Sequence, residues 1–273
     1  MAYTEITINV LEDNKEIILA ELHEIGFDGV WDKGHELCAY IETDVFNHKL
    51  LYDTLAKYRM ENHFSHKAIE DTNWNEEWEK NYDPVYIDDR VYVRSPFHPP
   101  DDSYDYEVII QPQMSFGTGH HQTTRIMMEM MLTMDFDKKE VLDMGTGTGV
   151  LAIFASLLGG TSVLGIDNDS NSLENANENL KYNEVTGVTY AHGSHESIPN
   201  KSFDIILSNI TKNINLSLLP HLAKKVSKGG YLVMAGFLTF DLEEVNREVL
   251  KYSMVAERNI SLADWECILY KKI

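Results

Sequence analysis

The stretch VLDMGTGTG (residues 141–149), followed after a helix-length gap by LGID (residues 164–167), decides the fold of this chain. The first run is typical of a buried strand that leads into a glycine-rich turn, and the second ends the next strand on a carboxylate. Such a turn lets a ligand approach the backbone closely at a helix N-terminus, and the carboxylate can accept both hydroxyls of a ribose. The two runs therefore predict a pocket for an adenosine cofactor.

Details of the turn distinguish between the adenosine cofactors. A dinucleotide fingerprint has the spacing Gly-x-Gly-x-x-Gly, whereas here Gly149 comes one residue early and Val150 occupies the expected site. Asp143 adds a carboxylate that we expect at the lip of the turn, where it repels a pyrophosphate and attracts a sulfonium or an amino group. The pattern favours S-adenosylmethionine over a nicotinamide cofactor, and the two carboxylates argue against a tight turn without a ligand.

Composition places the chain among ordinary globular proteins. Its 273 residues, 43% of them hydrophobic, suffice for a sizeable core and suggest two domains. The N-terminal residues show no signal-peptide pattern and no apolar run has the length of a membrane span, so we expect a cytoplasmic protein without a membrane partner. Cys38 and Cys267 are far apart and lack CxxC spacing, which disfavours both a disulfide framework and a zinc site.

The net charge of −21, from 44 acidic and 23 basic side chains, is the strongest bias in the composition. It disfavours direct binding to the phosphate backbone of a nucleic acid and favours a cationic partner. Solubility alone is an equally simple reason for such acidity, so the charge gains meaning only beside a substrate.

The chain divides into three predicted parts. Residues 1–70 alternate as β-α-β-β-α-β, the order of a small α+β ferredoxin-like domain, for which we expect either substrate recognition or a structural cap. Residues 71–84 form an acidic linker whose Trp74 and Trp78 lie on one face of a helical turn, either as a docking contact or as part of a hinge. Residues 85–273 alternate strands and helices.

This alternation predicts an α/β domain with a doubly wound, mostly parallel seven-stranded sheet. The expected strands cover residues 140–143, 162–167, 187–191, 203–207 and 230–235, with a closing pair at 253–260 and 265–270. Ligands of such sheets bind at the carboxyl ends of the strands, where the glycine turn and Asp167 converge with the segment SNIT (residues 208–211).

Asn209 is the candidate catalytic residue in that third segment. Its side-chain carbonyl can accept a hydrogen bond from an incoming amine while its amide nitrogen stays tethered, which orients a nucleophile toward a methyl group. The alternative is a helix N-cap, a common role for asparagine before a helix.

The segment FGTGHHQTT (residues 116–124) precedes the sheet. It is open to two interpretations, a lid over a small ligand or a plain turn and helix start capped by Thr123 or Thr124. His120 and His121 are adjacent and have no HExxH-type spacing, so we expect no metal.

Together these segments resemble a known family. Residues 116–124, 143–149, 165–167 and 208–210, with the terminal DWEC (residues 264–267), are similar to the bacterial methyltransferases that modify large-subunit ribosomal protein eleven. The resemblance covers essentially the whole chain. It implies a class I fold and S-adenosylmethionine-dependent methylation of lysine side-chain amines and the N-terminal amine of that ribosomal protein, which the small domain grips.

The resemblance also assigns site residues. The expected cofactor contacts are Thr124, Gly145, Asp167 and Asn209, with Phe116, Gly117, Thr118 and Gly119 in the wall and Asp143 and Gly147 nearby. The chain departs from the usual family pattern at Thr146 and Thr148 in the glycine turn and at Ser208 and Thr211 around Asn209. None of these departures removes a glycine or the asparagine, although the amine pocket near Thr211 is expected to differ.

The expected mechanism is an in-line displacement in which a neutral amine attacks the sulfonium methyl, with Asn209 as the orienting group and no assigned general base. Two alternatives remain at this point. A nicotinamide-dependent oxidoreductase is favoured only by the glycine turn and Asp167, and a non-catalytic ribosome assembly factor would keep the fold without consuming the cofactor.

Overall fold

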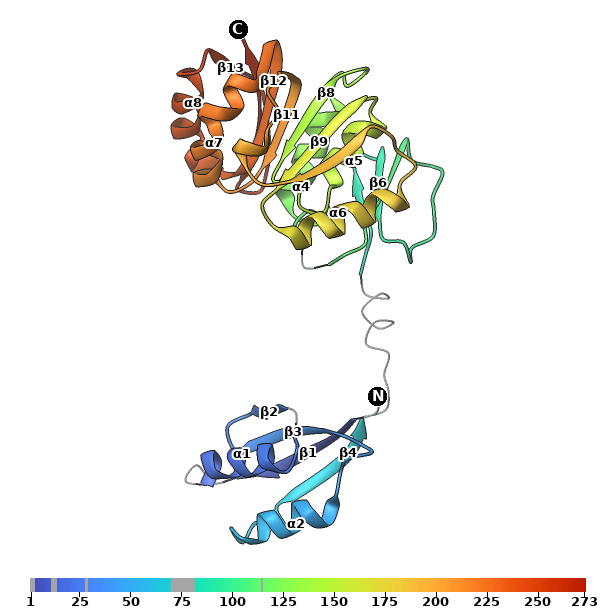
Figure 1. Ribbon diagram of the computed structural model, residues 1–273, viewed down its shortest axis with the longest axis vertical. Coiled ribbons are helices and arrows are strands. Elements are labelled where there is room, and N and C mark those ends of the chain that lie inside the picture. The colour runs from blue at the N-terminus through green and yellow to red at the C-terminus, as the bar shows by residue number, and fades with distance from the viewer. Residues whose placement is uncertain (1–2, 11–13, 28, 70–81, 114) are drawn as a thin grey trace. The chain divides into compact units, whose positions relative to one another are not determined.

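The protein is described by a computed structural model, which covers residues 3–10, 14–27, 29–69, 82–113 and 115–273. Contacts within the chain separate two compact units, Met1–Tyr82 and Asp83–Ile273 (Figure 1). Trp74 and Trp78 of the expected linker lie outside the described residues, so their predicted role stays a prediction.

The first unit is a four-stranded antiparallel sheet with two helices on one face. Its strand order, β2-β3-β1-β4, is that of the ferredoxin-like split β-α-β arrangement predicted from the sequence. Alternate residues of β1 such as Ile6 and Ile8 are fully buried and pack with Leu22 and Leu55 from the two helices. The elements are β1 (Tyr3–Asn9), α1 (Lys15–Glu24), β2 (Gly29–Asp32), β3 (Glu36–Glu42), α2 (His48–Ala56) and β4 (Phe64–Ile69).

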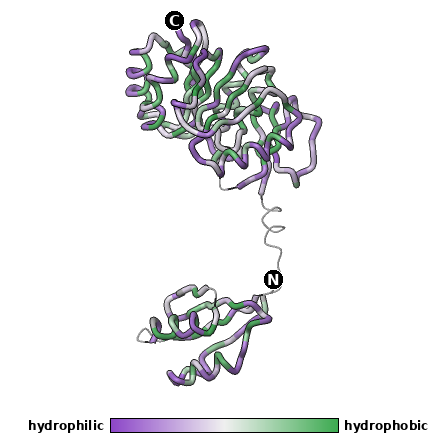
Figure 2. Tube along the Cα trace, in the orientation of Figure 1, coloured by the Kyte–Doolittle hydropathy of each residue, from purple (hydrophilic) through white to green (hydrophobic). Residues whose placement is uncertain are grey.

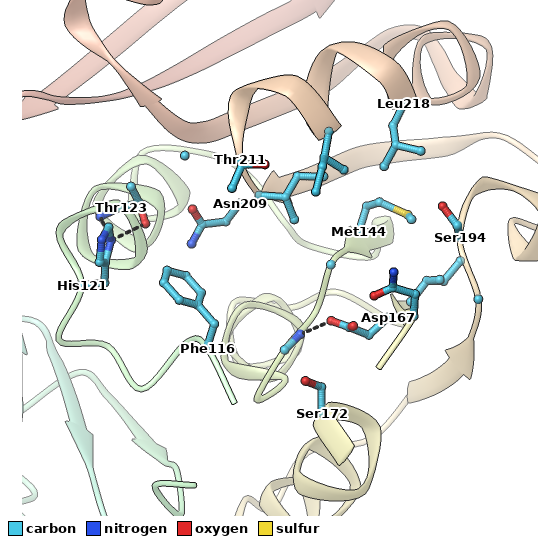
Figure 3. Close-up of a pocket in the computed structure, with 18 of the residues that line it drawn as sticks. Phe116, His121, Thr123, Met144, Asp167, Ser172, Ser194, Asn209, Thr211 and Leu218 are labelled. Carbon is cyan, nitrogen blue, oxygen red and sulfur yellow. Dashed lines mark hydrogen bonds between the residues drawn. The ribbon is translucent and has the colours of Figure 1, made fainter. Parts of the chain in front are cut away.

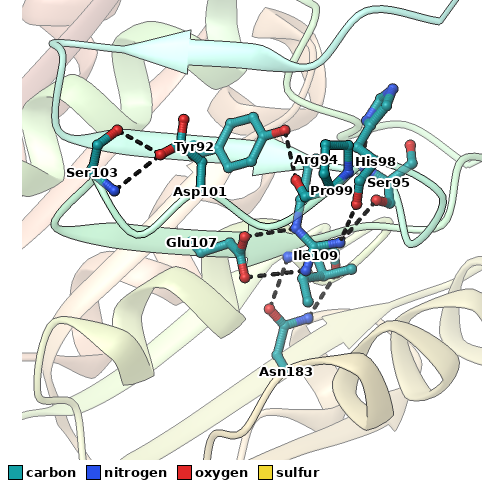
Figure 4. A network of polar contacts seen from close by, with 10 residues as sticks. All are labelled: Tyr92, Arg94, Ser95, His98, Pro99, Asp101, Ser103, Glu107, Ile109 and Asn183. Carbon is teal, nitrogen blue, oxygen red and sulfur yellow. Dashed lines mark hydrogen bonds and ion pairs between the residues drawn. The ribbon is translucent and has the colours of Figure 1, made fainter.

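The second unit begins with a small sheet of β5 (Val85–Ile87), β6 (Val91–Arg94) and β7 (Tyr106–Ile109). Polar contacts fix this sheet (Figure 4): the Arg94 guanidinium donates to both carboxylate oxygens of Glu107, at 2.7 and 3.2 Å. The Asn183 side chain donates to the Ile109 carbonyl and accepts from the Ile109 amide. The small sheet is thereby joined to the C-terminal end of α6 (Ser170–Tyr182).

The central sheet has seven strands in the order β10-β9-β8-β11-β12-β14-β13. The first five are parallel, and β14 runs antiparallel to both β12 and β13. This confirms the predicted doubly wound, mostly parallel sheet. The strands are β8 (Glu140–Met144), β9 (Ser162–Asp167), β10 (Val188–His192), β11 (Phe203–Asn209), β12 (Val226–Leu238), β13 (Met254–Leu262) and β14 (Trp265–Lys272).

Helices cover both faces of this sheet and bury its apolar residues. On one face α4 (Gln122–Leu132) and α5 (Val150–Leu157) pack over the strands, and on the other lie α7 (Lys212–Lys225) and α8 (Leu242–Leu250). The methionine-rich side of α4 is fully buried, as expected for a core-facing stripe. Figure 2 shows hydrophobic segments gathered inside this unit and hydrophilic segments on its outer loops.

Several strands are longer than expected, and one difference affects the site. The expected strand 203–207 continues as β11 to Asn209, because Ser208 and Asn209 pair with Met234 and Ala235 of β12. Asn209 is therefore held by a hydrogen-bonded ladder instead of by a loop, which fixes the direction of its side chain.

Within the described residues, no helix has the length and apolarity needed to cross a membrane.

Candidate active site at the carboxyl ends of the strands

A cavity of about 390 Å³ opens at the carboxyl ends of the parallel strands (Figure 3). Its size falls in the usual range for small-molecule sites. Residues at or just after the ends of β8, β9, β10 and β11 contribute to it, together with Gly236 inside β12, residues before and at the start of α4, and the first residue of β14. The lining residues are Phe116, His121, Thr123, Met144, Gly145, Gly147, Ile166, Asp167, Asn168, Ser172, Gly193, Ser194, Asn209, Ile210, Thr211, Ile214, Leu218, Gly236 and Trp265.

Two glycines of the turn, Gly145 and Gly147, line the cavity as predicted, and both have positive φ angles, +75° and +53°. A Cβ at Gly145 would collide with the side chain of Ile210, and one at Gly147 with the Phe116 carbonyl oxygen. The glycines are thus required for the close packing of three loops around the site, in addition to the ligand approach expected from the sequence.

Asp167 lies where the sequence places it, at the end of β9 and in the cavity wall. Its Oδ2 accepts a hydrogen bond from the Gly147 amide at 2.8 Å, and its Oδ1 accepts one from the Asp169 amide at 3.0 Å. A carboxylate has about four lone-pair sites, so both oxygens retain capacity for a ligand hydroxyl. These contacts couple the carboxylate to the glycine turn.

Asp143 does not lie at the lip of the turn, so this expectation was wrong. Alternate residues of a strand point to opposite faces, and Asp143 shares the face of Val141, which belongs to the core beneath α5. Its carboxylate is fully buried and accepts a 2.6 Å hydrogen bond from the Thr146 hydroxyl. Burial raises the pKa of Asp143 to about 7, against the smaller opposing effect of that hydrogen bond.

Asn209 has the geometry predicted for an orienting residue. Its Nδ2 donates to the Thr124 hydroxyl at 3.4 Å, whereas its Oδ1 is buried and has no hydrogen-bond partner. The N-cap alternative is wrong, because α7 begins three residues later, at Lys212, and Thr211 occupies the cap position without a side-chain bond. Thr124 lies behind Asn209 and is absent from the cavity wall, so it acts on the site through the asparagine.

Asn215 of α7 fixes the chain around Asn209. It is fully buried, and its Nδ2 donates to the carbonyls of Ile210 and Ala235 at 2.7 and 2.8 Å. The Ser208 hydroxyl donates to its Oδ1 at 2.7 Å. Ser208, one of the departures from the family pattern, thus satisfies a buried acceptor directly beside the site.

The segment 116–124 provides less of the wall than expected. Phe116 lines the cavity, but Gly117, Thr118 and Gly119 do not. The Gly117 carbonyl accepts from the Thr148 hydroxyl at 2.6 Å, which accounts for another departure and packs this segment on the glycine turn. The three residues therefore support the wall from outside.

The cap of α4 also differs from the expected one. His121 occupies the N-cap, where its Nδ1 accepts from the Thr123 amide at 3.2 Å, so neither Thr123 nor Thr124 caps the helix. The ring of His121 lies between Phe116 and Trp265, with centroid distances of 5.2 and 4.9 Å. These three rings form an aromatic wall at the Asn209 end of the cavity.

The sequence did not identify His121 and Trp265 as lining residues. Trp265 begins β14, which is antiparallel to β12, so its start lies at the edge where the parallel strands end. Only the position of β14 in the sheet reveals this. No group of three or more histidine, cysteine or acidic side chains suited to a metal occurs in the part of the chain that the structure describes.

Comparison with known proteins places this site in a family. Residues 2–273 match the family described as Ribosomal protein L11 methyltransferase (PrmA). The chain belongs to this family. A ribosomal protein L11 methyltransferase of Phocaeicola vulgatus is 34% identical over 278 residues, covering 99% of each chain. One of Porphyromonas gingivalis is 40% identical over 237 residues, covering 85% of this chain and 82% of the other.

A solved structure supports the fold. The ribosomal protein L11 methylase of Lactobacillus delbrueckii subsp. bulgaricus has 25% sequence identity and a TM-score of 0.65, and the match covers 70% of this chain and 100% of the other. The family members are S-adenosylmethionine-dependent methyltransferases, and this chain is one of them. The nicotinamide-dependent alternative is therefore not supported.

The observed side chains fit the cofactor of this family. The cavity offers a carboxylate, Asp167, at one end and an unpartnered buried carbonyl oxygen, Asn209 Oδ1, at the other. Between them the glycine turn brings bare backbone to the surface. A carboxylate suits the ribose hydroxyls, and the free carbonyl suits a donor such as an amine.

Proposed function

We propose that this protein transfers methyl groups from S-adenosylmethionine to lysine side-chain amines and the N-terminal amine of ribosomal protein L11. The names of its relatives support the substrate protein. The observation that carries the amine chemistry is the buried and unpartnered Oδ1 of Asn209 in the cavity wall. A buried acceptor without a partner costs about 1–3 kcal/mol, so its retention indicates that a ligand donor completes it.

Asn209 acts by positioning the nucleophile. An N–H of a neutral amine donates to Oδ1, which leaves the nitrogen lone pair directed away from the asparagine and toward the methyl donor. The bond from Nδ2 to Thr124 and the pairing of β11 with β12 hold the carbonyl in place. Alignment of this kind can supply on the order of seven kcal/mol of the barrier reduction.

The aromatic wall keeps the amine end apolar and uncharged. Burial lowers the pKa of His121, and its Nδ1 accepts from the Thr123 amide, so the neutral ring carries its proton on Nε2. A ring in this state does not repel an ammonium and does not accept a proton at Nε2. Together with Phe116 and Trp265 it surrounds the target amine with uncharged aromatic faces.

The reaction then needs no general base. When bound, S-adenosylmethionine supplies an electrophilic methyl carbon on a sulfonium. The amine loses its proton to water before the attack, because an apolar wall disfavours the ammonium form. Asp167 and the glycine turn would hold the cofactor while its methyl group passes to the amine nitrogen and the electron pair of the broken carbon–sulfur bond stays on sulfur.

We propose that the first unit recognises the substrate protein. We also propose that the reaction takes place in the cytoplasm, which cell fractionation would test. The net charge of −21 supports electrostatic attraction of a basic ribosomal protein. Each unit has its own hydrophobic core, so deletion of residues 1–70 is expected to leave cofactor binding intact. It is also expected to abolish methylation of L11, and retained methylation would disprove the recognition role.

Intact-mass analysis tests the proposed activity. Unmodified L11 is incubated with the protein and S-adenosylmethionine, with Asn209→Ala as the control. Successive mass increments of whole methyl groups, lost in the variant, are expected, and peptide mapping then identifies the amines. No increment despite demonstrated cofactor binding would refute L11 as the substrate, and other basic proteins would then be tested.

A further inference from the structure

Three large apolar side chains are exposed near the amine end of the cavity. Phe116 and Ile214 line the cavity, yet they are 52% and 51% exposed. Phe240, in the 3₁₀ turn Thr239–Asp241 after β12, is 80% exposed. Scattered surface apolar residues are common, but two in the wall of one cavity, with a third in a turn tied to residues beside that wall, indicate a surface that another molecule covers.

One side of the 3₁₀ turn is tied to the segment that carries Trp265. The Thr239 amide donates to the Asp264 carbonyl at 2.9 Å, and the Thr239 hydroxyl donates to Glu266 Oε1 at 3.1 Å. Asp264 and Glu266 are the two neighbours of Trp265 in the chain. Phe240 therefore follows a residue that is anchored beside the aromatic wall.

The other side of the turn is tied to the start of α7. Asp241 Oδ1 and the Lys212 ammonium are 2.7 Å apart, and Lys212 also contacts Glu244 at 2.9 Å. Lys212 directly follows Thr211, which lines the cavity. Anchored on both sides, the backbone at Phe240 lies close to two residues that neighbour the cavity lining, Asp264 and Lys212, and its ring is exposed.

We propose that Phe240, Phe116 and Ile214 form an apolar collar that packs against apolar side chains flanking the target amine in the substrate protein. The proposal rests on the proposed function and specifies which residues of the substrate protein should flank the target amine. The collar is continuous with the cavity that the amine must enter. Its contact with an apolar flank excludes water at the opening, which favours the neutral amine that the reaction needs.

The ion pair beside Phe240 does not offer an alternative partner, and the exposed residues Glu243 and Asp264 attract a basic segment whatever flanks its amine. Asp241 and Lys212 already pair with each other inside the rim, so neither presents a free charge to a polar flank. A substrate segment with small polar residues beside its amine would leave the three apolar side chains in water. The collar therefore discriminates by burial instead of by charge.

The test compares Phe240→Ala with Leu250→Ala, a control in which an apolar residue of 60% exposure is removed from the far end of α8. Both are assayed on unmodified L11 and on L11 variants in which the apolar neighbours of each mapped amine are replaced by serine. Phe240→Ala is expected to lower kcat/KM on unmodified L11 by about tenfold or more, through KM, because the burial of one aromatic ring is lost. The same change should have less than about a twofold effect on the serine variants, since the two partners are coupled.

Cofactor affinity, measured by calorimetry, should be unchanged in both variants, and Leu250→Ala should match the wild type throughout. The proposal is overturned if Phe240→Ala behaves like Leu250→Ala, if it weakens cofactor binding to the same extent, or if the modified amines have no apolar neighbours. A wild-type protein that binds cofactor but modifies no amine of L11 overturns the proposed function itself.

Discussion

Asp167 and Asn209 end the two strands on either side of β8 and lie in one cavity, yet the protein treats them differently. Both carboxylate oxygens of Asp167 already accept hydrogen bonds from main-chain amides. Asn209 has a single bond of 3.4 Å from its Nδ2 and an Oδ1 without a partner. Asp167 is thus oriented by main-chain amides, whereas under the proposed function the free carbonyl of Asn209 is completed by the substrate.

This contrast predicts that substitutions at the two ends affect different quantities, the affinity for the cofactor and the rate of methyl transfer. Changes at the Asp167 end should alter how tightly the cofactor binds, because that end is formed before the substrate arrives. Changes at the Asn209 end should alter the rate of transfer, because in the proposed function its carbonyl orients the nucleophile.

The largest effect is expected for Asn209→Ala. Loss of the orienting carbonyl should reduce the single-turnover rate at saturating cofactor by about two to three orders of magnitude, the range found when one positioned polar group is removed from an active site. Cofactor affinity, measured by calorimetry, should change by less than about threefold. A loss of affinity as large as the loss of rate would show that the two ends are not separate.

Asp143 lies on β8, between the strands that carry Asp167 and Asn209. Its buried carboxyl group allows a test of whether a charge beneath the cavity destabilises the fold. Its pKa is about 7 when folded, against 3.8 for an ordinary aspartate, so the folded state holds this proton between those pH values. The protonated Asp143 side chain therefore makes its full contribution to the stability of the fold below about pH 4, and that contribution is lost as the pH rises through about 7. Ionised Asp143 destabilises the fold above that pH.

Asp143→Asn removes this ionisation and keeps an acceptor for the Thr146 hydroxyl. Relative to the wild type, the free energy of unfolding of the variant should rise between pH 5 and pH 8 by roughly 2–3 kcal/mol. Urea unfolding at the two pH values measures the difference. An equal change at both pH values would exclude ionisation as the cause.

The fold followed from the sequence where burial dictates an apolar run. The expected strand 162–167 coincides with β9, because a strand covered on both faces must be apolar almost throughout. The start of β12 was missed, since Ser227, Lys228 and two glycines resemble a turn. Val226 nevertheless pairs with Phe203, so pairing to a neighbour extends the strand beyond its apolar part.

The site followed from the sequence where a residue ends a parallel strand. Asp167 and Asn209 were predicted because the carboxyl ends of parallel strands share one edge. Trp265 and Ser194 were not, since their places depend on the sheet order and on loop conformation. Asp143 was misplaced because its direction depends on the pleat of β8, which the presence of a glycine turn does not reveal.

Asp167→Ala should weaken cofactor binding by about tenfold to 150-fold, since hydrogen bonds to a charged group contribute about 1.5–3 kcal/mol and the Gly147 amide also loses its acceptor. The transfer rate at saturating cofactor should stay within about threefold of the wild type. Calorimetry and single-turnover kinetics measure the two quantities. Unchanged affinity would refute the ribose role.

Thr124→Val should give the smallest effect. It preserves the shape of a buried side chain and removes only the acceptor of the Asn209 Nδ2 hydrogen bond, whose length of 3.4 Å indicates a weak contact. The ladder between β11 and β12 still holds the backbone of Asn209, so the single-turnover rate should fall only about threefold to tenfold, corresponding to about 1 kcal/mol. A loss as large as that of Asn209→Ala would mean that the threonine, and not the strand, holds the carbonyl in place, and cofactor affinity should remain unchanged in either case.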